Sequence, residues 1–383
     1  MGLFDIFKRK KKPIQTDTQQ NENPSQHVPT NISVSVNVSV PKPPTQAELD
    51  AAVILVETRI KTAIASKQGL FPHEILVLDY AHTFYTDGNS FQGFWWYKHG
   101  VRDVQAVLSS LIKRGFLQIG DLRAVLDKQN ATNIKEVLKS HGIKTTGKKA
   151  ELVQRVLDEI PESELNERFP RRTYSLTEAG QSALDEAAYV PYIHRHGVED
   201  LDIWSLNKLV HSQPYMRYRD KIWGYLNQRS IKHFSDRNFG LYRNCRLSMA
   251  QFLREEKKTK DALAMLAEVV FCDLSDATNN YDPQFLEIYA GGFFPYEDSL
   301  AKIAPGMISA IVECQNELEY SDDDLKSALV ERMSKLRLPL QLFTAEECAQ
   351  IVILERDQNI KELKNLYNKA KRVFEKKYPN IKI

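Results

Sequence analysis

The amino-acid sequence predicts a mainly α-helical protein built from more than one domain. Its 383 residues correspond to about two to four domains at roughly 100–200 residues each. Apolar residues recur every three or four positions along most of the chain, and the alternation typical of a strand is confined to short stretches. Hydrophobic residues make up 42% and charged residues 27%, and no apolar run approaches the ~20 residues that span a bilayer. We therefore expect neither a wholly disordered chain nor integral membrane association.

Charge is distributed unevenly, although the net charge is only +2. Residues 1–12 carry a net +4, residues 128–160 a net +3 and residues 361–383 a net +6, which leaves −11 for the rest. Basic segments attract polyanions such as nucleic acid or an anionic membrane surface, but they can also be ordinary solvated faces. In the last segment the helical spacing of apolar residues also suits an amphipathic helix docked on a core.

Residues 1–44 are interpreted as a basic N-terminus and a disordered linker. Residues 13–44 are rich in Gln, Asn, Thr, Ser and Pro and hold few large apolar residues. Within them, residues 32–40 alternate strictly, which predicts an edge strand or a strand added to a partner. Residues 3–7 offer a short amphipathic anchor for anionic lipid, and a frayed basic tail is the alternative.

The cysteines predict buried free thiols rather than a metal site. They are 27, 42 and 34 residues apart and form no CxxC pair, so zinc is not expected. All lie in apolar helical stretches, which suits a reducing compartment, and we expect a cytoplasmic protein without cofactors. The four residues are Cys245, Cys272, Cys314 and Cys348.

Residues 45–190 are predicted to form the first folded domain. Thr45 and Glu48 have the spacing of a capping box, so a helix is expected from Thr45 to about Lys67. Pro72 opens a second helix as a first-turn proline, and a third helix covers about residues 101–113.

Two short strands, at residues 116–119 and 173–176, flank a long interruption, and a helix follows from about residue 177 to 188. This order suits a winged helix with an insertion, and residues 111–117 and 174–180 resemble the wings of bacterial winged-helix proteins. Winged helices often bind DNA, but many bind only protein. The aromatic residues within 91–97 are expected to fill a core, and base stacking is the alternative.

The inserted segment, residues 122–160, predicts two short helices joined by a tight hinge. Asn133 can cap the first helix, and Gly142 ends it. Thr146 can cap the second helix, and Pro161 ends that one.

Basic residues gather on this helical pair. Lys135 and Lys139 are i,i+4 neighbours on a polar face of the first helix. Lys148 and Lys149 lie in the first turn of the second helix, and Arg155 follows two turns along. Cations beside the exposed N–H groups of a helix N-terminus make a phosphate site.

The segment resembles the SAP module, a helix–hinge–helix motif of DNA-binding proteins. The resemblance lies in residues 147–156, GKKAELVQRV, with Val156 in place of a last leucine. It implies contacts to the backbone of duplex DNA, centred on Lys149 and Arg155, that read little sequence. The alternative is a helical pair that only packs on its neighbours. The candidate DNA-binding residues are Lys135, Lys139, Lys144, Thr146, Gly147, Lys148, Lys149 and Arg155.

Residues 142–149 also satisfy GxxxxGK, the pattern of a nucleotide-binding loop. Such a loop needs Ser or Thr after the lysine to hold Mg²⁺, and it needs a strand before it. Here Lys149 follows the lysine and a helix is predicted to precede, so we expect no ATP or GTP binding.

Residues 198–383 are predicted to form a helical C-terminal domain. Apolar and small residues at 249–269 fit one helix–turn–helix unit similar to a tetratricopeptide repeat, although no 34-residue recurrence follows. Later helices are expected at about residues 299–319, 322–335, 344–356 and 358–377. A helical scaffold of this kind often presents a groove to another protein, or it only covers its own core.

These observations predict a non-enzymatic nucleic-acid-binding protein. The SAP-like module would bind DNA, and the C-terminal helices would bind a protein partner. One alternative is a protein-interaction scaffold that binds no nucleic acid. Another is an enzyme whose site is assembled from distant residues, although no GxSxG, HExxH or dinucleotide-binding fingerprint is present.

Overall fold

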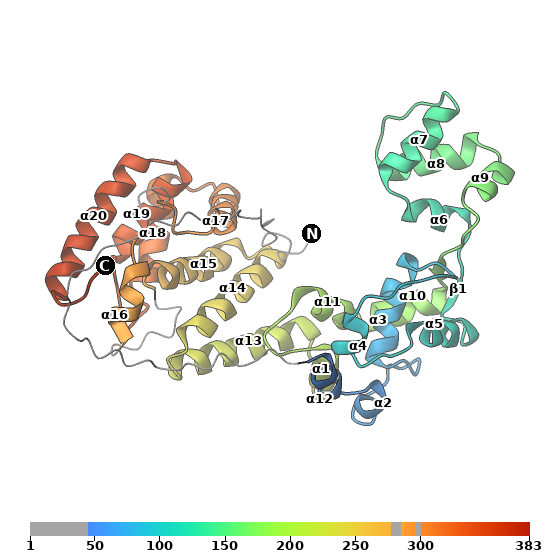
Figure 1. Cartoon of the computed structure of the whole chain (residues 1–383), viewed down its shortest axis with the longest axis horizontal. Helices are drawn as coiled ribbons and strands as arrows, with labels where there is room; N and C mark the ends of the chain where they lie inside the picture. Colours follow the sequence, from blue (N-terminus) through green and yellow to red (C-terminus); the bar gives the residue numbers. More distant parts are fainter. Residues whose placement is uncertain (1–44, 277–284, 296–299) are drawn as a thin grey trace, which may run out of the picture. The chain divides into compact units, whose positions relative to one another are not determined.

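The computed structural model describes residues 45–276, 285–295 and 300–383. The chain divides between His196 and Gly197 into two compact units, which are described separately below. Helices dominate both units, so the predicted mainly α-helical class is confirmed (Figure 1). The expected N-terminal linker, its strand and the basic residues 1–12 lie outside the described residues.

The first unit begins with two short helices instead of the one long helix predicted. Thr45 and Glu48 form the expected capping box at the start of α1 (Gln46–Ala51). The helix then stops, and α2 (Val56–Arg59) starts after an extended segment. The amide of Val56 donates to the carbonyl oxygen of Gly100 (3.1 Å), so a tertiary contact replaces the helical bond that local periodicity predicts.

The centre of this unit is α3 (Pro72–Tyr80), which starts at Pro72 as predicted and is buried along most of its length. It continues into the short η2 (Ala81–Thr83) and packs against α5 (Val104–Lys113), α10 (Glu178–Glu186) and α11 (Tyr189–His196).

Of the five aromatic residues within 91–97, one is buried, three are half-buried and one is exposed. Four of these residues form α4 (Phe94–Tyr97). Trp95 is the buried one, at 1% exposed, and its ring lies edge-on to that of Tyr80, with 5.4 Å between the ring centroids. Tyr97 is 65% exposed and is not part of this core. The core interpretation is therefore confirmed for Trp95 and does not extend to Tyr97.

Two predicted strands form the small sheet of the first unit. β1 (Leu117–Ile119) pairs antiparallel with β2 (Tyr174–Leu176), with Leu117 opposite Leu176. An isolated bridge joins Tyr85 to Thr173, directly before β2. The insertion between β1 and β2 holds α6 (Leu122–Lys128), α7 (Ala131–Ser140), α8 (Lys149–Glu159) and α9 (Glu162–Arg168).

Two histidines of the first unit are held in a largely neutral state. Burial, with a smaller contribution from Arg114, lowers the pKa of His73 to about 4. Burial also lowers the pKa of His194 to about 4, with help from nearby cations. The His194 ring lies between the Tyr80 hydroxyl (3.0 Å) and the His99 ring (3.1 Å). These two contacts fix the position of the His194 ring.

In its described residues the second unit holds helices and one isolated bridge, between Val198 and Leu201. Four helices come first: α12 (Ile203–Ser212), α13 (Tyr218–Ser235), α14 (Phe239–Glu255) and α15 (Thr259–Leu274). Then follow α16 (Leu286–Tyr289), η5 (Ala290–Gly292), α17 (Pro305–Glu317), α18 (Asp322–Met333), α19 (Ala345–Arg356) and α20 (Ile360–Lys377). The predicted helix–turn–helix is the pair α14 and α15, whose facing residues Ala250 and Ala262 are fully buried. Its likeness to a tetratricopeptide repeat stays a prediction.

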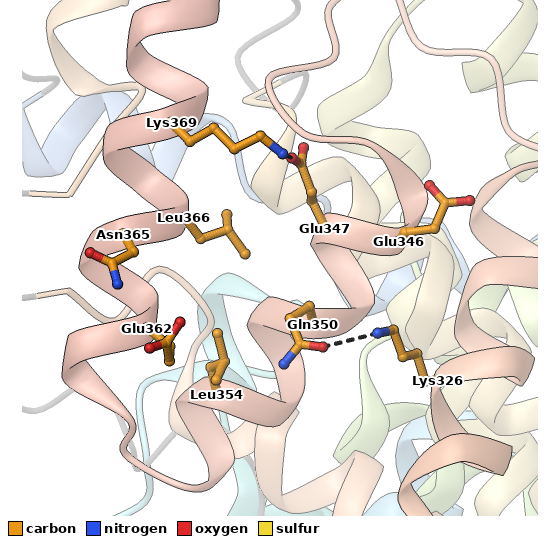
Figure 2. Close-up of a pocket in the computed structure, with 9 residues that line it drawn as sticks. All are labelled: Lys326, Glu346, Glu347, Gln350, Leu354, Glu362, Asn365, Leu366 and Lys369. Atoms are coloured by element: carbon orange, nitrogen blue, oxygen red, sulfur yellow. Dashed lines mark hydrogen bonds and ion pairs between the residues drawn. The ribbon is translucent and has the colours of Figure 1, made fainter.

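An open groove of about 460 Å³ lies on the second unit between α18, α19 and α20. Figure 2 shows Leu354 and Leu366 among its lining residues, with charged and amide groups around them. Lys369 pairs there with Glu347 at 3.0 Å. The groove is thus a mixed surface rather than a purely apolar one.

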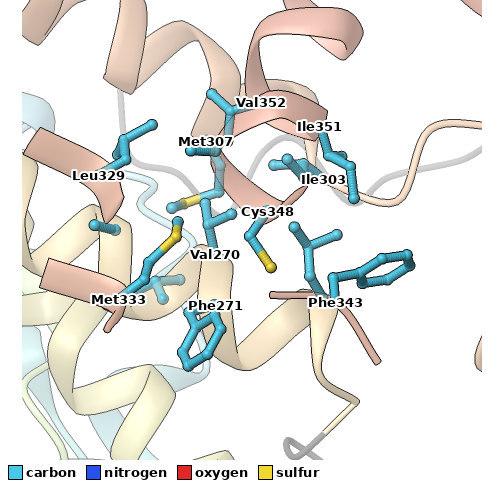
Figure 3. Close-up of a cluster of buried hydrophobic side chains, with 14 of the residues drawn as sticks. Val270, Phe271, Ile303, Met307, Leu329, Met333, Phe343, Cys348, Ile351 and Val352 are labelled. Carbon is cyan, nitrogen blue, oxygen red and sulfur yellow. The ribbon is translucent and has the colours of Figure 1, made fainter. Parts of the chain in front are cut away.

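The core of the second unit gathers apolar side chains from α14 to α20 (Figure 3). Cys348 lies within it, and burial raises the pKa of its thiol above the ordinary range. All four cysteines are buried and free, as predicted. Among the described residues, no helix is both long and apolar enough to cross a membrane. The same residues contain no cluster of three His, Cys, Asp or Glu suited to a metal.

Candidate nucleic-acid interface

The inserted helices share a small hydrophobic core of their own. Each of α6, α7, α8 and α9 contributes apolar residues to it, so the insertion extends beyond the two helices that the sequence predicted. Its buried members are Leu122, Leu126, Ile134, Val137, Leu138, Leu152, Val153, Val156, Ile160 and Leu165. A rigid core of this kind fixes the helix ends and the hinge that carry the candidate residues.

The two predicted helix caps are wrong by two or three residues. Asn130, and not Asn133, caps α7, because its side-chain oxygen accepts from the Asn133 amide (2.7 Å). Lys148, and not Thr146, is the N-cap residue of α8. A lysine side chain accepts no hydrogen bond, so α8 begins without the side-chain cap that α7 has.

The hinge depends on two glycines with positive φ. Gly142 (φ 68°) ends α7 as predicted, and the Ile143 amide returns to the Leu138 carbonyl oxygen (2.9 Å), as in a Schellman motif. Gly147 has φ 132°, and a Cβ there would lie 2.5 Å from Oε2 of Glu151. The hinge conformation therefore requires the glycine at position 147 for its φ, whereas the flexible end of the Glu151 side chain can shift to make room for a Cβ.

Arg155 and Lys149 hold the hinge to the rest of the module. Arg155 is half-buried, and its Nη1 donates to the carbonyl oxygens of Lys144 (2.6 Å) and Thr146 (3.2 Å). The Lys149 amine donates to the carbonyl oxygen of Asp127 at the end of α6. The two residues expected at the centre of DNA contact thus also have structural partners, and their contact with phosphate stays a prediction.

Four other candidate lysines are exposed. Lys135 and Lys139 lie one turn apart on α7, Lys144 lies in the hinge, and Lys148 precedes α8. Within the part of the chain that the structure describes, the amines of these four make no ion pair or hydrogen bond. No carboxylate of the described residues is therefore ion-paired with these four amines.

The start of α8 presents unused backbone donors. The amides of Lys149, Ala150 and Glu151 have no acceptor among the described residues, and all three residues are exposed. The Glu151 carboxylate turns back to the Lys148 amide (3.2 Å). The exposed amides, the positive end of the helix and two free lysines nearby suit a bound anion.

The sequence did not predict the cation–π contacts that connect this module to the segments beside the sheet. The Lys128 amine lies 3.1 Å from the ring centroid of Tyr85, and the Arg171 guanidinium carbon lies 3.9 Å from the same centroid. Burial and, second, Arg171 lower the pKa of Lys128. Arg171 also pairs with Asp87 (3.1 Å). No local sequence pattern indicates these contacts, because the three residues are far apart in the chain.

Comparison with known proteins agrees with this geometry. The family model of the SAP domain matches residues 126–160, which include α7, the hinge and α8. No curated protein matches the chain. The match covers all eight candidate residues and begins within α6, whose Leu122 and Leu126 belong to the core of the module. Residues 126–160 of this chain are therefore a SAP domain.

Proposed function

We propose that the protein is a non-enzymatic nucleic-acid-binding protein whose SAP domain holds the phosphate backbone of duplex DNA. The SAP domain is in general a DNA-binding module, which supports nucleic-acid binding by residues 126–160. The observation that carries the duplex-backbone proposal is the uncapped start of α8, with its free amides beside the unpaired lysines 144 and 148.

A phosphate at this helix end would find donors that need no rearrangement. The amides of Lys149, Ala150 and Glu151 already point out of the first turn, as in every α-helix. The amines of Lys144 and Lys148 add charge that no carboxylate of the described residues neutralises. Such contacts position a protein on the backbone without reading base sequence. We expect binding with weak sequence preference.

Lys135 and Lys139 extend this surface along α7. One helical turn separates them by about 6 Å along the axis, at 1.5 Å per residue. Both amines are exposed and unpaired within the described chain. We propose that they contact further phosphates, whereas Arg155 acts chiefly by holding the hinge carbonyls in place.

The part of the first unit around the SAP domain supports a winged-helix-like arrangement. The chain order is α3, the bridge at Tyr85, α4, α5, β1, the insertion and β2. The bridge partner, Thr173, directly precedes β2, which itself pairs with β1. We propose that the SAP domain occupies the place of the wing tip, and that the stack on Tyr85 sets its orientation.

The test is a salt series of duplex-DNA binding, followed by fluorescence anisotropy of a labelled duplex. The test variant is Lys144→Gln/Lys148→Gln, because neither amine has a partner in the described chain. The control is Lys61→Gln/Lys67→Gln, which removes the same charge at exposed positions of the first unit outside the module. Each phosphate contact contributes about −0.9 to the slope of log K against log salt. The slope measured for the test variant should therefore be less steep than that of the parent by about 2.

Two outcomes would contradict the proposal. One is no binding of the parent protein at low salt. The other is a test variant whose slope and affinity equal those of the control variant. Melting temperatures of both variants should match the parent, because the replaced amines make no contact within the described residues.

The runner-up is an interaction scaffold that binds protein only. The groove between α18, α19 and α20 favours it, since Leu354 and Leu366 line it together with charged and amide side chains. The same titration separates the two functions. Absence of DNA binding with retained protein binding by the second unit would make the scaffold the better assignment.

A further inference from the structure

We propose that the outward face of α20 is a second surface for the phosphate backbone of nucleic acid, carried by the second unit. This inference rests on the proposed function, because it assigns the same kind of ligand to a different part of the chain. It also gives a role to the strongly basic residues 361–383, which carry eight Lys and Arg against two Asp and Glu.

The way α20 packs decides which of its faces is available. Leu363, Tyr367, Ala370 and Phe374 are buried and belong to the core of the second unit. They recur every three or four residues, so the opposite side of the helix faces outward. In Figure 1, α20 lies at the margin of its unit, with α19 beside it.

The outward face is lined with cations that have no partner. Lys361, Lys364, Arg372 and Lys376 are exposed, and they make no ion pair or hydrogen bond with their side chains among the described residues. By contrast, Lys369 on the neighbouring side is bound to Glu347. Lys369, which lines the groove, is thus paired, whereas these four cations are not.

The groove side of α20 does not suit a phosphate. Figure 2 shows Glu346, Glu347 and Glu362 around the groove, and these carboxylates repel an anion. The Lys326 amine is bound to the side-chain oxygen of Gln350 (3.0 Å). A polyanion would therefore find its cations on the outer face and not in the groove.

Among polyanions, a nucleic acid fits this face best. The 18 residues of α20 measure about 27 Å at 1.5 Å per residue. A duplex of that length carries about sixteen phosphate charges, at one per 1.7 Å of axis. A helix that binds a membrane surface inserts an apolar face, but the apolar face of α20 is already buried in its own unit. Only Ile360 (57% exposed) and Val373 (59%) are large exposed apolar residues of α20.

The experiment compares two variants of identical net charge. Lys361→Gln/Lys364→Gln/Arg372→Gln removes three cations of the outward face. Lys208→Gln/Lys260→Gln/Lys335→Gln removes three exposed cations elsewhere on the second unit. Each full-length protein is titrated with a labelled duplex of about 40 base pairs across a salt series. If each of the three cations contacts one phosphate, the slope of log K against log salt should be less steep for the α20 variant than for the parent by about 2 to 3. It should also bind at least fivefold more weakly than the control variant at about 0.1 M salt.

The Lys144→Gln/Lys148→Gln variant keeps the two proposals apart. If it loses affinity while the α20 variant matches its control, the SAP domain binds DNA and this inference is wrong. If the parent binds no DNA at all, the proposed function is wrong and this inference falls with it. If the α20 variant loses binding only to phosphatidylserine vesicles, the face is a membrane surface and the inference is overturned. Should the triple variant melt below its control, Lys364→Gln and Arg372→Gln are tested singly.

Discussion

Gly147 shows how one residue sets the shape of the SAP-domain hinge. At φ 132° it occupies a region open almost only to glycine, and an added Cβ would meet the Glu151 carboxylate at 2.5 Å. We expect Gly147→Ala to lower the unfolding free energy of the module by about 1–3 kcal/mol, the usual cost of such strain. Hydrogen exchange of peptides from α6 to α9, measured across a urea series, reports this quantity.

Gly142→Asn is the matched control for Gly147→Ala. Gly142 has φ 68°, where asparagine is tolerated, and a Cβ there would meet no atom within 4 Å. Its cost should stay below about 1 kcal/mol. Equal exchange protection in the two variants would mean that the conformation at Gly147 does not constrain the module.

The contacts of Arg155 could not be predicted from the sequence. A basic residue on the polar side of a predicted helix is equally consistent with a ligand contact and with a local structural contact. The structure shows its guanidinium bound to the carbonyl oxygens of Lys144 and Thr146. These contacts depend on the path of the hinge backbone, which no side-chain pattern specifies.

At the scale of elements, the cap of α7 offers a direct test of the structure against the sequence prediction. Asn130 caps α7 in the structure, whereas the sequence pattern pointed to Asn133. Replacing a true cap by alanine costs about 1 kcal/mol, because an amide at the helix start loses its acceptor. We therefore expect Asn130→Ala to lower the stability of the module by about 1 kcal/mol in urea unfolding.

Asn133→Ala should cost much less, since its side chain makes only a 3.3 Å hydrogen bond with the side chain of Gln129. The variant that loses more stability identifies the residue that caps α7. A larger loss for Asn133→Ala than for Asn130→Ala would place the start of α7 three residues later than in the structure.

Long amphipathic helices were predictable, and short or interrupted ones were not. The last three helices start within two residues of their predicted starts, because each has a capping residue and a sustained apolar stripe. The strands β1 and β2 were also placed correctly. The break after α1 was missed because the carbonyl of Gly100, a residue distant in sequence, takes the Val56 amide. α17 starts at Pro305, later than predicted, because proline suits the first turn of a helix.

For the molecule as a whole, charge counts predicted the location of cations but not their availability. The basic segments at residues 128–160 and 361–383 were evident from the sequence. Which lysines are already occupied depends on tertiary contacts, such as Lys149 with the end of α6 and Lys369 with Glu347. The stack of Lys128 and Arg171 on Tyr85 joins three distant segments and was invisible in the sequence.

Buried histidines make the stability of the first unit depend on pH. His73 and His194 have a pKa of about 4 in the folded chain, chiefly because burial disfavours the charged ring. In the unfolded chain the pKa returns to about 6.5. The unfolded state therefore gains protons first as pH falls, so stability is complete above about pH 6.5 and declines between about pH 6.5 and 4.

Between pH 7 and pH 5 this linkage predicts a loss of about 1–2 kcal/mol for each histidine, with the smaller value for His194, whose partial exposure screens it. Urea unfolding measures this loss of stability through the fluorescence emission of Trp95 and Trp96, with the two tryptophans of the second unit replaced by phenylalanine.

His194→Gln removes one titrating group and should flatten the dependence of stability on pH. His82→Gln is the control, because it removes a histidine that is exposed. A parent protein equally stable at both pH values would show that these rings are not held neutral, and their packing would need another explanation.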